Sequence, residues 1–184
     1  MTRRIGAVSQ PADGSLRLRV AYLAVAIGVI VLDQITKAVV AARIPLHTTI
    51  SVIPGFFDLT HVRNTGAAFG ILAGEASSGR TLLLTGVALV VFGGVVIYAW
   101  RSPARETVLQ TALAFISGGA VGNLIDRIRF DSVTDFLRFY VGAHEWPSFN
   151  MADSAITTGV LLLAWDIWRR PGQEPASSPG KAPA

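Results

Sequence analysis

The sequence predicts a membrane protein of the all-α class, with four transmembrane helices and a small extracytoplasmic β-sheet region. Three observations lead to this prediction. Only 15% of the 184 residues are charged, whereas soluble domains average about 25%. The mean hydropathy is +0.49. Four stretches of the chain also approach the roughly 20 apolar residues that are needed to cross the hydrocarbon core of a bilayer.

The predicted spans are residues 20–42, 81–100, 108–125 and 152–168. The first span is interrupted only by Asp33 and Lys37, and the second carries no charged residue. The fourth has Asp153 near its start and Asp166 near its end. The first span is not expected to be a cleavable signal peptide, because it is longer than the apolar region of such peptides, contains a charge pair and lacks a clear small-x-small exit.

The distribution of positive charge predicts the direction of the spans. With four spans, both termini lie on one side of the membrane. The two chain ends (1–19 and 169–184) and the connection 101–107 lie on that side and together hold nine Lys and Arg residues in 42 positions. The loops 43–80 and 127–151 on the other side hold six in 63 positions. Because cytoplasmic segments carry the excess of Lys and Arg, both termini are predicted to be cytoplasmic. The same flanking arginines account for the basic pI of 10.1. No basic run carries the interleaved aromatics expected of a nucleic-acid site.

The two outer loops and the chain ends complete the predicted organisation. The stretch "TTISVIPGFFDLTHV" in the first outer loop has β-branched and aromatic runs around Pro54 and Gly55, which indicates a small hairpin or sheet. The membrane domain is predicted to cover residues 17–170. An N-terminus of residues 1–16 and a Pro/Gly/Ser/Ala-rich tail of residues 171–184 are predicted to be disordered and cytoplasmic.

Several polar or small residues lie inside the predicted spans, where large apolar residues would be expected. Asp33 and Lys37 are four residues apart, so they share one helix face and can pair. A charge in mid-membrane costs about 2.5–3.5 kcal/mol or more. The pair could hold neighbouring helices together, or it could contact a substrate, and the sequence leaves both possibilities open. Gly118 and Gly122 form a small-xxx-small pattern, which predicts close helix packing.

The outer end of the third span carries Asn123 and Asp126. The negative end of a helix dipole disfavours a carboxylate there, so we expect Arg127 or Arg129 to balance Asp126 in a structural ion pair. Asp131 follows in a polar, turn-like stretch and is expected to be solvated.

Two other acids stand at the outer interface. Asp135 is flanked by apolar residues, and Asp153 opens the fourth span. Asp153 could be an ordinary capping acid at a helix start, or the two acids could form a pair on neighbouring elements. There is no cysteine, which excludes a thiol nucleophile. The three histidines show no metal-ligand spacing and are expected to be solvated loop residues: His47, His61 and His144.

Four motifs in order, "DQITKAVV", "RNTGAAFGIL", "GGAVGNLIDRIRFDSVTDFL" and "FNMADSAI", resemble those of lipoprotein signal peptidase, also called signal peptidase II. The resemblance covers roughly residues 20–168. It implies an aspartic endopeptidase of the bacterial plasma membrane that needs no metal or cofactor. Its substrate would be a prolipoprotein whose cysteine carries diacylglycerol, cut just before that cysteine, near the outer face, by a single chain surrounded by membrane lipid.

The resemblance also implies roles for individual residues. Asp135, in "VTDF", and Asp153, in "FNMAD", would be the catalytic dyad that activates water. Thr134 stands where a hydrophobic residue is common in the family, and we expect this change to be tolerated. Substrate-binding or dyad-supporting roles are implied for Asp33, Lys37, Asn64, Gly66, Asn123, Arg127, Asn150 and Ala152.

Two other classes of protein compete with this interpretation. A small transporter or proton-conducting protein would also place charged residues within spans, but its polar residues should extend across the whole bilayer, whereas the second span is bare. A non-enzymatic scaffold would explain the small residues and the charge pair. It would not need both Asp135 and Asp153.

Overall fold

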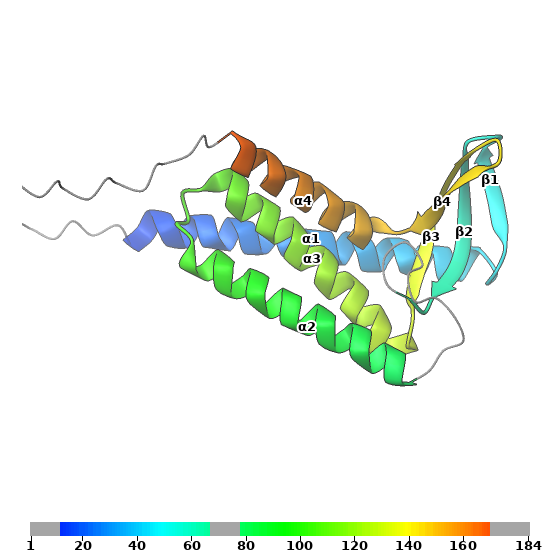
Figure 1. Cartoon of the computed structure of the whole chain (residues 1–184), viewed down its shortest axis with the longest axis horizontal. Helices are drawn as coiled ribbons and strands as arrows, with labels where there is room; N and C mark the ends of the chain where they lie inside the picture. The colour runs from blue at the N-terminus through cyan, green and yellow to red at the C-terminus, as the bar shows by residue number, and fades with distance from the viewer. Residues whose placement is uncertain (1–11, 67–77, 170–184) are drawn as a thin grey trace, which may run out of the picture.

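A computed structural model describes residues 12–66 and 78–169. In this part of the chain four helices lie beside one another, with a small sheet at one end and both ends of the described chain at the other (Figure 1). The helices are α1 (Ala12–Arg43), α2 (Ser78–Arg101), α3 (Thr107–Phe130) and α4 (Met151–Trp168). The strands are β1 (Thr49–Ile53), β2 (Phe57–Asn64), β3 (Val133–Val141) and β4 (His144–Phe149). The predicted class, mostly helical with a small sheet, is confirmed at this level.

Three helices of the described residues are long and apolar enough to cross a membrane: Gly14–Arg43, Leu82–Arg101 and Thr107–Phe130. They coincide with the first three predicted spans. The helix α4 occupies the fourth predicted span with 18 residues, but it is not among the three, and Asp153 and Asp166 lower its mean hydropathy. Large apolar side chains cover the outside of the bundle, such as Leu82 at 72% and Val90 at 77% exposure. Together with the three long apolar helices, such a surface is typical of a membrane protein.

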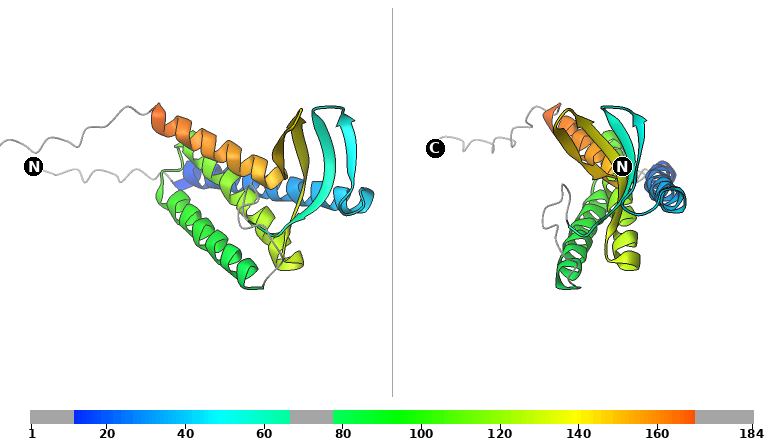
Figure 2. Two further views of the ribbon diagram at one scale, coloured as in Figure 1. Left: turned by 45° about the vertical axis from the view of Figure 1, so that its right-hand side comes forward. Right: turned by 90° about the vertical axis from the view of Figure 1, so that its right-hand side faces the viewer.

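Glycines bring the helix α3 close to both α1 and α4. A Cβ atom at Gly118 would lie 2.7 Å from the carbonyl oxygen of Ala26 on α1, and one at Gly122 would lie 2.6 Å from Oδ2 of Asp33. On the other side, Gly119 faces the Ala152 carbonyl of α4. The close packing predicted for Gly118 and Gly122 is therefore confirmed. The helix α3 contacts α1, α2 and α4, and Figure 2 shows it among these helices.

The sheet is antiparallel in the order β1-β2-β3-β4. The hairpin predicted around Pro54 and Gly55 is present as β1 and β2, and Gly55 takes a φ of +81° in its turn. The other two strands lie in a segment that was predicted only as a loop. Residues 133–141 are nevertheless rich in β-branched and aromatic residues, which favour a strand. Val40, Ile44 and Phe136 form the apolar cluster that joins α1 to the sheet.

The predicted disordered ends lie largely outside the described residues. The exception is residues 12–16, which form the start of α1. This helix therefore begins eight residues before the predicted start of the first span.

Candidate active site

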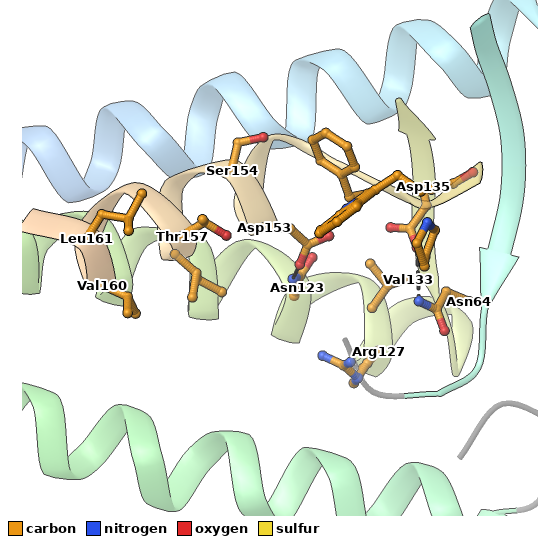
Figure 3. Close-up of a pocket in the computed structure, with 15 residues that line it drawn as sticks. Asn64, Asn123, Arg127, Val133, Asp135, Asp153, Ser154, Thr157, Val160 and Leu161 are labelled. Atoms are coloured by element: carbon orange, nitrogen blue, oxygen red, sulfur yellow. Dashed lines mark hydrogen bonds between the residues drawn. The ribbon is translucent and has the colours of Figure 1, made fainter. Parts of the chain in front are cut away.

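Asp135 and Asp153 lie in one pocket, although β3 carries the first and α4 the second. The pocket has a volume of about 500 Å³, and its polar end also includes Asn64, Asn123 and Arg127 (Figure 3). Its other walls come from the Trp146–Phe149 segment of β4 and from apolar residues along α4. The sequence had placed the two acids on neighbouring elements without showing that they meet, and the fold brings them together.

Asn150 connects the two carboxylates. Its Nδ2 donates to Oδ1 of Asp135 at 2.7 Å, and its backbone N–H donates to Oδ2 of Asp153 at 3.2 Å. Its Oδ1 accepts the backbone N–H of Asp153 at 2.9 Å, so Asn150 and Asp153 form a capping box at the start of α4. Asp153 is therefore both a capping acid and a residue of the pocket, and the two possibilities left open by the sequence hold together.

Two further asparagines each donate a hydrogen bond to the carboxylate oxygen that Asn150 does not contact. Nδ2 of Asn64 donates to Oδ2 of Asp135 at 2.9 Å, and Nδ2 of Asn123 donates to Oδ1 of Asp153 at 2.7 Å. Oδ1 of Asn123 accepts Nζ of Lys37 at 3.0 Å. Amide donors fix the direction of each carboxylate without adding a charge to the pocket.

The pair of Asp33 and Lys37 lies behind the pocket and does not line it. The two residues are 0% and 4% exposed, and Nζ of Lys37 is 2.8 Å from Oδ2 of Asp33. Oδ1 of Asp33 accepts the backbone N–H of Ala152, in the first turn of α4, at 2.9 Å. These contacts support the structural interpretation of the pair. They join α1 to α4, and through Asn123 to Asp153.

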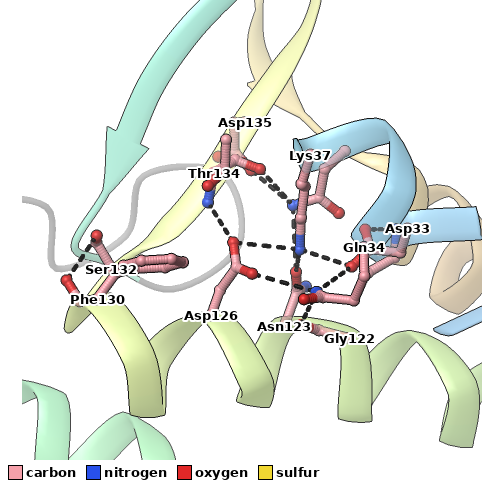
Figure 4. Close-up of polar contacts among 12 residues, drawn as sticks. Asp33, Gln34, Lys37, Gly122, Asn123, Asp126, Phe130, Ser132, Thr134 and Asp135 are labelled. Atoms are coloured by element: carbon pink, nitrogen blue, oxygen red, sulfur yellow. Dashed lines mark hydrogen bonds and ion pairs between the residues drawn. The ribbon is translucent and has the colours of Figure 1, made fainter. Parts of the chain in front are cut away.

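Asp126 has different partners from those predicted. Its Oδ2 lies 3.5 Å from Nζ of Lys37 and accepts the backbone N–H of Thr134 at 2.9 Å, while its Oδ1 accepts Nε2 of Gln34 at 3.2 Å (Figure 4). The expected ion pair with Arg127 or Arg129 was wrong, because Asp126 is 1% exposed and faces α1 and β3. The sequence analysis missed Gln34, which also donates to Asp33 and to the Gly122 carbonyl.

Thr134 is anchored on three sides next to Asp135. Besides the bond from its N–H to Asp126, its carbonyl accepts a hydrogen bond from Nδ2 of Asn150 at 3.3 Å, and its hydroxyl accepts one from Nη1 of Arg63 at 3.0 Å. The hydroxyl that departs from the common hydrophobic residue of the family thus has a partner within the fold.

Arg127 lines the pocket, and Gly66 contacts both Arg127 and Asn64 just after the end of β2. Nη2 of Arg127 donates to the Gly66 carbonyl at 3.3 Å, and the Gly66 N–H donates to Oδ1 of Asn64 at 2.9 Å. The chain that leads away from β2 is thereby attached to α3 beside Asp135. The pocket residues implied by the sequence motifs are thus assembled from α3, α4, β3 and the end of β2.

The environment of Asp135 favours its protonated form. Its removal from water and the nearby charge of Asp153 raise the pKa of Asp135 to about 7, while hydrogen bonds from Asn64 and Asn150 act in the opposite direction. Two carboxylates in one pocket cannot both ionise readily, so they hold a proton between them near neutral pH. Such a pair can activate water and polarise a carbonyl group.

The histidines contribute nothing to the pocket. His61 is buried, and its Nδ1 lies 2.8 Å from the Ile44 carbonyl, so its prediction as a solvated loop residue was wrong. It stands on β2, whose inner face packs on the end of α1. Among residues 12–66 and 78–169 there is no group of three His, Cys, Asp or Glu side chains that could hold a metal ion.

A carboxylate pair in a mostly helical membrane protein is an arrangement that a membrane-embedded hydrolase of the aspartic type can use. Comparison with known proteins identifies the family. The protein-family model described as signal peptidase (SPase) II matches residues 25–169. The chain therefore belongs to the signal peptidase II family and is a peptidase. This membership favours neither the transporter nor the scaffold interpretation.

Individual relatives agree with this assignment. Lipoprotein signal peptidases of Syntrophus aciditrophicus and Desulforapulum autotrophicum are 46% and 48% identical over 139 residues, which is 76% of this chain and 86% of each relative. Two solved structures described as bacterial membrane enzymes have TM-scores of 0.74 and 0.71, at 28% and 29% identity. They cover 87% and 82% of this chain and 94% of each solved chain.

Proposed function

We propose that this peptidase removes the signal peptide from diacylglyceryl-modified bacterial prolipoproteins, by cutting before the lipidated cysteine, and that Asp135 and Asp153 are its catalytic residues. The observation that carries the assignment of the dyad is that both carboxylates enter one pocket and are bonded to the same residue, Asn150. The names of the relatives supply the substrate class.

In the proposed reaction a water molecule lies between the two carboxylates. Asp153 takes a proton from this water, because the start of α4 stabilises an ionised carboxylate. Asp135, the protonated partner, donates its proton to the oxygen of the scissile carbonyl while the water oxygen bonds to its carbon. The C–N bond then breaks as the cysteine nitrogen takes the proton held by Asp153 and the amine leaves, and the hydroxyl formed on the carbonyl oxygen returns its proton to Asp135. The signal peptide is left with a new carboxyl group.

The shape of the pocket supports a lipid-anchored peptide as the substrate. Its polar end contains the dyad, and its apolar side follows α4 through Ile156, Val160 and Leu161. A signal peptide and a diacylglycerol group are both apolar, whereas the peptide bond to be cut is polar. A pocket that passes from one character to the other suits such a substrate.

The supporting residues act through the dyad in this proposal. Asn64, Asn123 and Asn150 orient the carboxylates, and Asp33 and Lys37 hold the elements that carry them. Gly66 and Arg127 shape the open side of the pocket, where a substrate backbone or headgroup would lie. Ala152 contributes its backbone N–H to Asp33.

The proposed topology has four spans, with α4 as the fourth, both termini in the cytoplasm, and the active site near the outer face of the plasma membrane. The Lys and Arg distribution supports this orientation, and the packing of α4 along α3 (Figure 1) supports the fourth span. A monomer is proposed to suffice, because one chain supplies both carboxylates.

Separate variants Asp135→Asn and Asp153→Asn test the dyad. Each should reduce cleavage of a diacylated prolipoprotein at least about 1,000-fold, because a catalytic carboxylate is lost, while the protein still unfolds cooperatively at a temperature not much below that of the wild type. Asp131→Asn is the matched control, since this acid lies outside the pocket and asparagine tolerates its φ of 54°. Near-normal cleavage by either dyad variant would refute the assignment. Cleavage of an unmodified prolipoprotein at the same rate would refute the substrate class.

A further inference from the structure

A second cavity lies between α1 and α2, away from the proposed active site. It is a groove of about 420 Å³ with α3 as its floor. Apolar side chains from three helices line it, including Leu23 and Ile27 on α1, Phe92 and Val96 on α2, and Leu113 on α3. Nothing in the proposed cleavage reaction uses this groove.

The groove exists because α2 packs on α3 and not along α1. In Figures 1 and 2 the two helices approach at the end that carries the described chain termini, and α2 then diverges toward the sheet end. None of the residues in the most apolar window of α2 is buried. Within a bilayer this space has to be filled by something apolar, because water does not enter it without a cost.

Polar contacts close the groove at the end near the termini. The guanidinium of Arg19 donates to the carbonyls of Ala99, Trp100 and Ser102 at 3.1–3.3 Å and lies 5.0 Å from the Trp100 ring centroid. The hydroxyl of Tyr22 donates to the Ala104 carbonyl at 3.1 Å. This rim fixes the start of α1 against the end of α2, so the groove is a built feature of the fold.

The rim is positively charged. Arg17, Arg101 and Arg105 are exposed at the same ends of the helices, in addition to the half-buried Arg19. Glu106 is the acid of this connection, so the balance remains positive. Basic pockets between helices at a membrane surface favour anionic lipid headgroups.

The groove also has the depth of one leaflet. Its lining on α1 begins at Leu16, and the part from Arg19, at the rim, to Ile30 is about 16 Å long at a rise of about 1.5 Å per residue. Half of a hydrocarbon core of roughly 30 Å is about 15 Å. A lipid whose phosphate lies at the rim would therefore place one acyl chain along the full length of the groove.

We infer that the groove between α1 and α2 binds an anionic phospholipid, with one acyl chain between the helices and the phosphate at the arginine rim. In the proposed orientation this lipid belongs to the cytoplasmic leaflet. The binding itself depends on neither that orientation nor the cleavage reaction. The lipid fills the space that α2 leaves against α1, and it thereby completes the packing of the helix that contacts the bundle least.

Native mass spectrometry of the full chain in detergent tests this inference, with phosphatidylglycerol and phosphatidylcholine of equal chain length added at equal concentration. We expect one phosphatidylglycerol per protein, retained about ten times more than phosphatidylcholine. Ser117→Phe places a ring on the floor of the groove and should reduce retention at least fivefold. Val90→Phe is the matched control, because Val90 is 77% exposed on α2 and does not line the groove.

A second variant keeps the inference testable if Ser117→Phe fails to fold. Arg17→Gln combined with Arg101→Gln changes only exposed side chains and should reduce the preference for phosphatidylglycerol to near that for phosphatidylcholine. Equal retention of both lipids by the wild type, unchanged retention by Ser117→Phe, or a protein dimer without lipid would overturn the inference. Cleavage of a prolipoprotein, measured in parallel, reports separately on the proposed function.

Discussion

Two networks of charged and polar side chains in this molecule have similar geometry and opposite surroundings. One is buried where α1, α3 and α4 meet the sheet, and its shortest ion pair joins Lys37 to Asp33 at 2.8 Å. The other lies on the sheet, where Arg138 contacts Glu145 at 2.7 Å. The first pair is at most 4% exposed, while Glu145 is 48% exposed. Nearly equal distances therefore have very different consequences for stability, because water screens only the second pair.

The buried network also links separate elements, whereas the network of the sheet joins neighbouring strands. Asp33 bonds to the start of α4, and Asp126 bonds to the backbone of β3. The two residues thereby fix the elements that carry Asp153 and Asp135. The network of the sheet, with Asp58 and Tyr140, only reinforces strands that are already paired.

The variant Asp33→Asn should have the largest effect on this comparison. It keeps the size of the side chain and an oxygen for the Ala152 N–H, but it removes the closest counter-charge of Lys37. Loss of one partner of a buried ion pair costs about 3–5 kcal/mol. We expect the unfolding temperature to fall by on the order of 10 °C, and cleavage to fall with it. Thermal unfolding in detergent measures this.

A second substitution separates charge from shape at the same site. Adding Lys37→Met to Asp33→Asn removes the unpaired cation, and should recover part of the lost stability. If the double variant is no more stable than Asp33→Asn, the burial of Lys37 without its partner is not the cause of the loss.

Gly122→Ala should have the next largest effect, because it presses on the same ion pair without removing a charge. The added methyl would lie 2.6 Å from Oδ2 of Asp33, and overpacking of this kind costs about 1–3 kcal/mol. Gly94→Ala on α2 is the control, since nothing lies within 4 Å of a Cβ there. It should be neutral or slightly stabilising, because alanine favours a helix more than glycine does. Equal effects of the two variants would contradict the prediction.

The pH dependence of cleavage tests how the buried network controls Asp135. In the proposed reaction Asp135 must be protonated, so cleavage should fall as the pH rises through about 7. The hydrogen bond from Asn64 lowers the pKa of Asp135. Asn64→Ala should therefore raise this pKa and move the alkaline limb of the kcat/KM profile to higher pH, whatever happens to its height. A limb that stays in place or moves down would exclude this role.

Stability should respond to pH in the same direction. The pKa of Asp135 is raised in the folded protein from its usual 3.8 to about 7, so the folded state binds the proton more tightly than the unfolded state. This carboxyl therefore lowers stability as the pH rises from about 4 to about 7. Asp135→Asn should gain stability relative to the wild type at pH 8 compared with pH 5, as measured by thermal unfolding.

Some parts of the molecule could be predicted from the sequence, and others could not. The helices that coincide with the first three predicted spans, the β1–β2 hairpin and the packing at Gly118 and Gly122 follow from local patterns. The resemblance to signal peptidase II selected residues that the fold brings into or behind one pocket. The hydrogen-bond and ion-pair partners of Asp126 could not be predicted from the sequence, because its contact with Lys37 depends on how α1 crosses α3.

The same reason explains the other errors. His61 was expected to be a solvated loop residue because it shows no metal-ligand spacing and lies in a predicted outer loop, but β2 turns it toward the carbonyl of Ile44 at the end of α1. The two strands in residues 133–149 were missed because polar residues interrupt their apolar pattern. One of these, Asp135, is polar because it lies in the pocket. Predictions from local sequence pattern were therefore wrong at positions whose surroundings are set by contacts between distant segments of the chain or by the pocket.

Glu145→Gln should have the smallest effect of the series, and it defines the other side of the comparison. The substitution removes the carboxylate that accepts two bonds from Arg138. Because Glu145 is half exposed and water screens the pair, the loss should be below about 1 kcal/mol, with cleavage unchanged and a smaller difference at high salt. Thermal unfolding at low and high ionic strength measures it. If Glu145→Gln destabilised the protein as much as Asp33→Asn, the exposed pair would have to hold the sheet on the helices, and burial would not be what distinguishes the two networks.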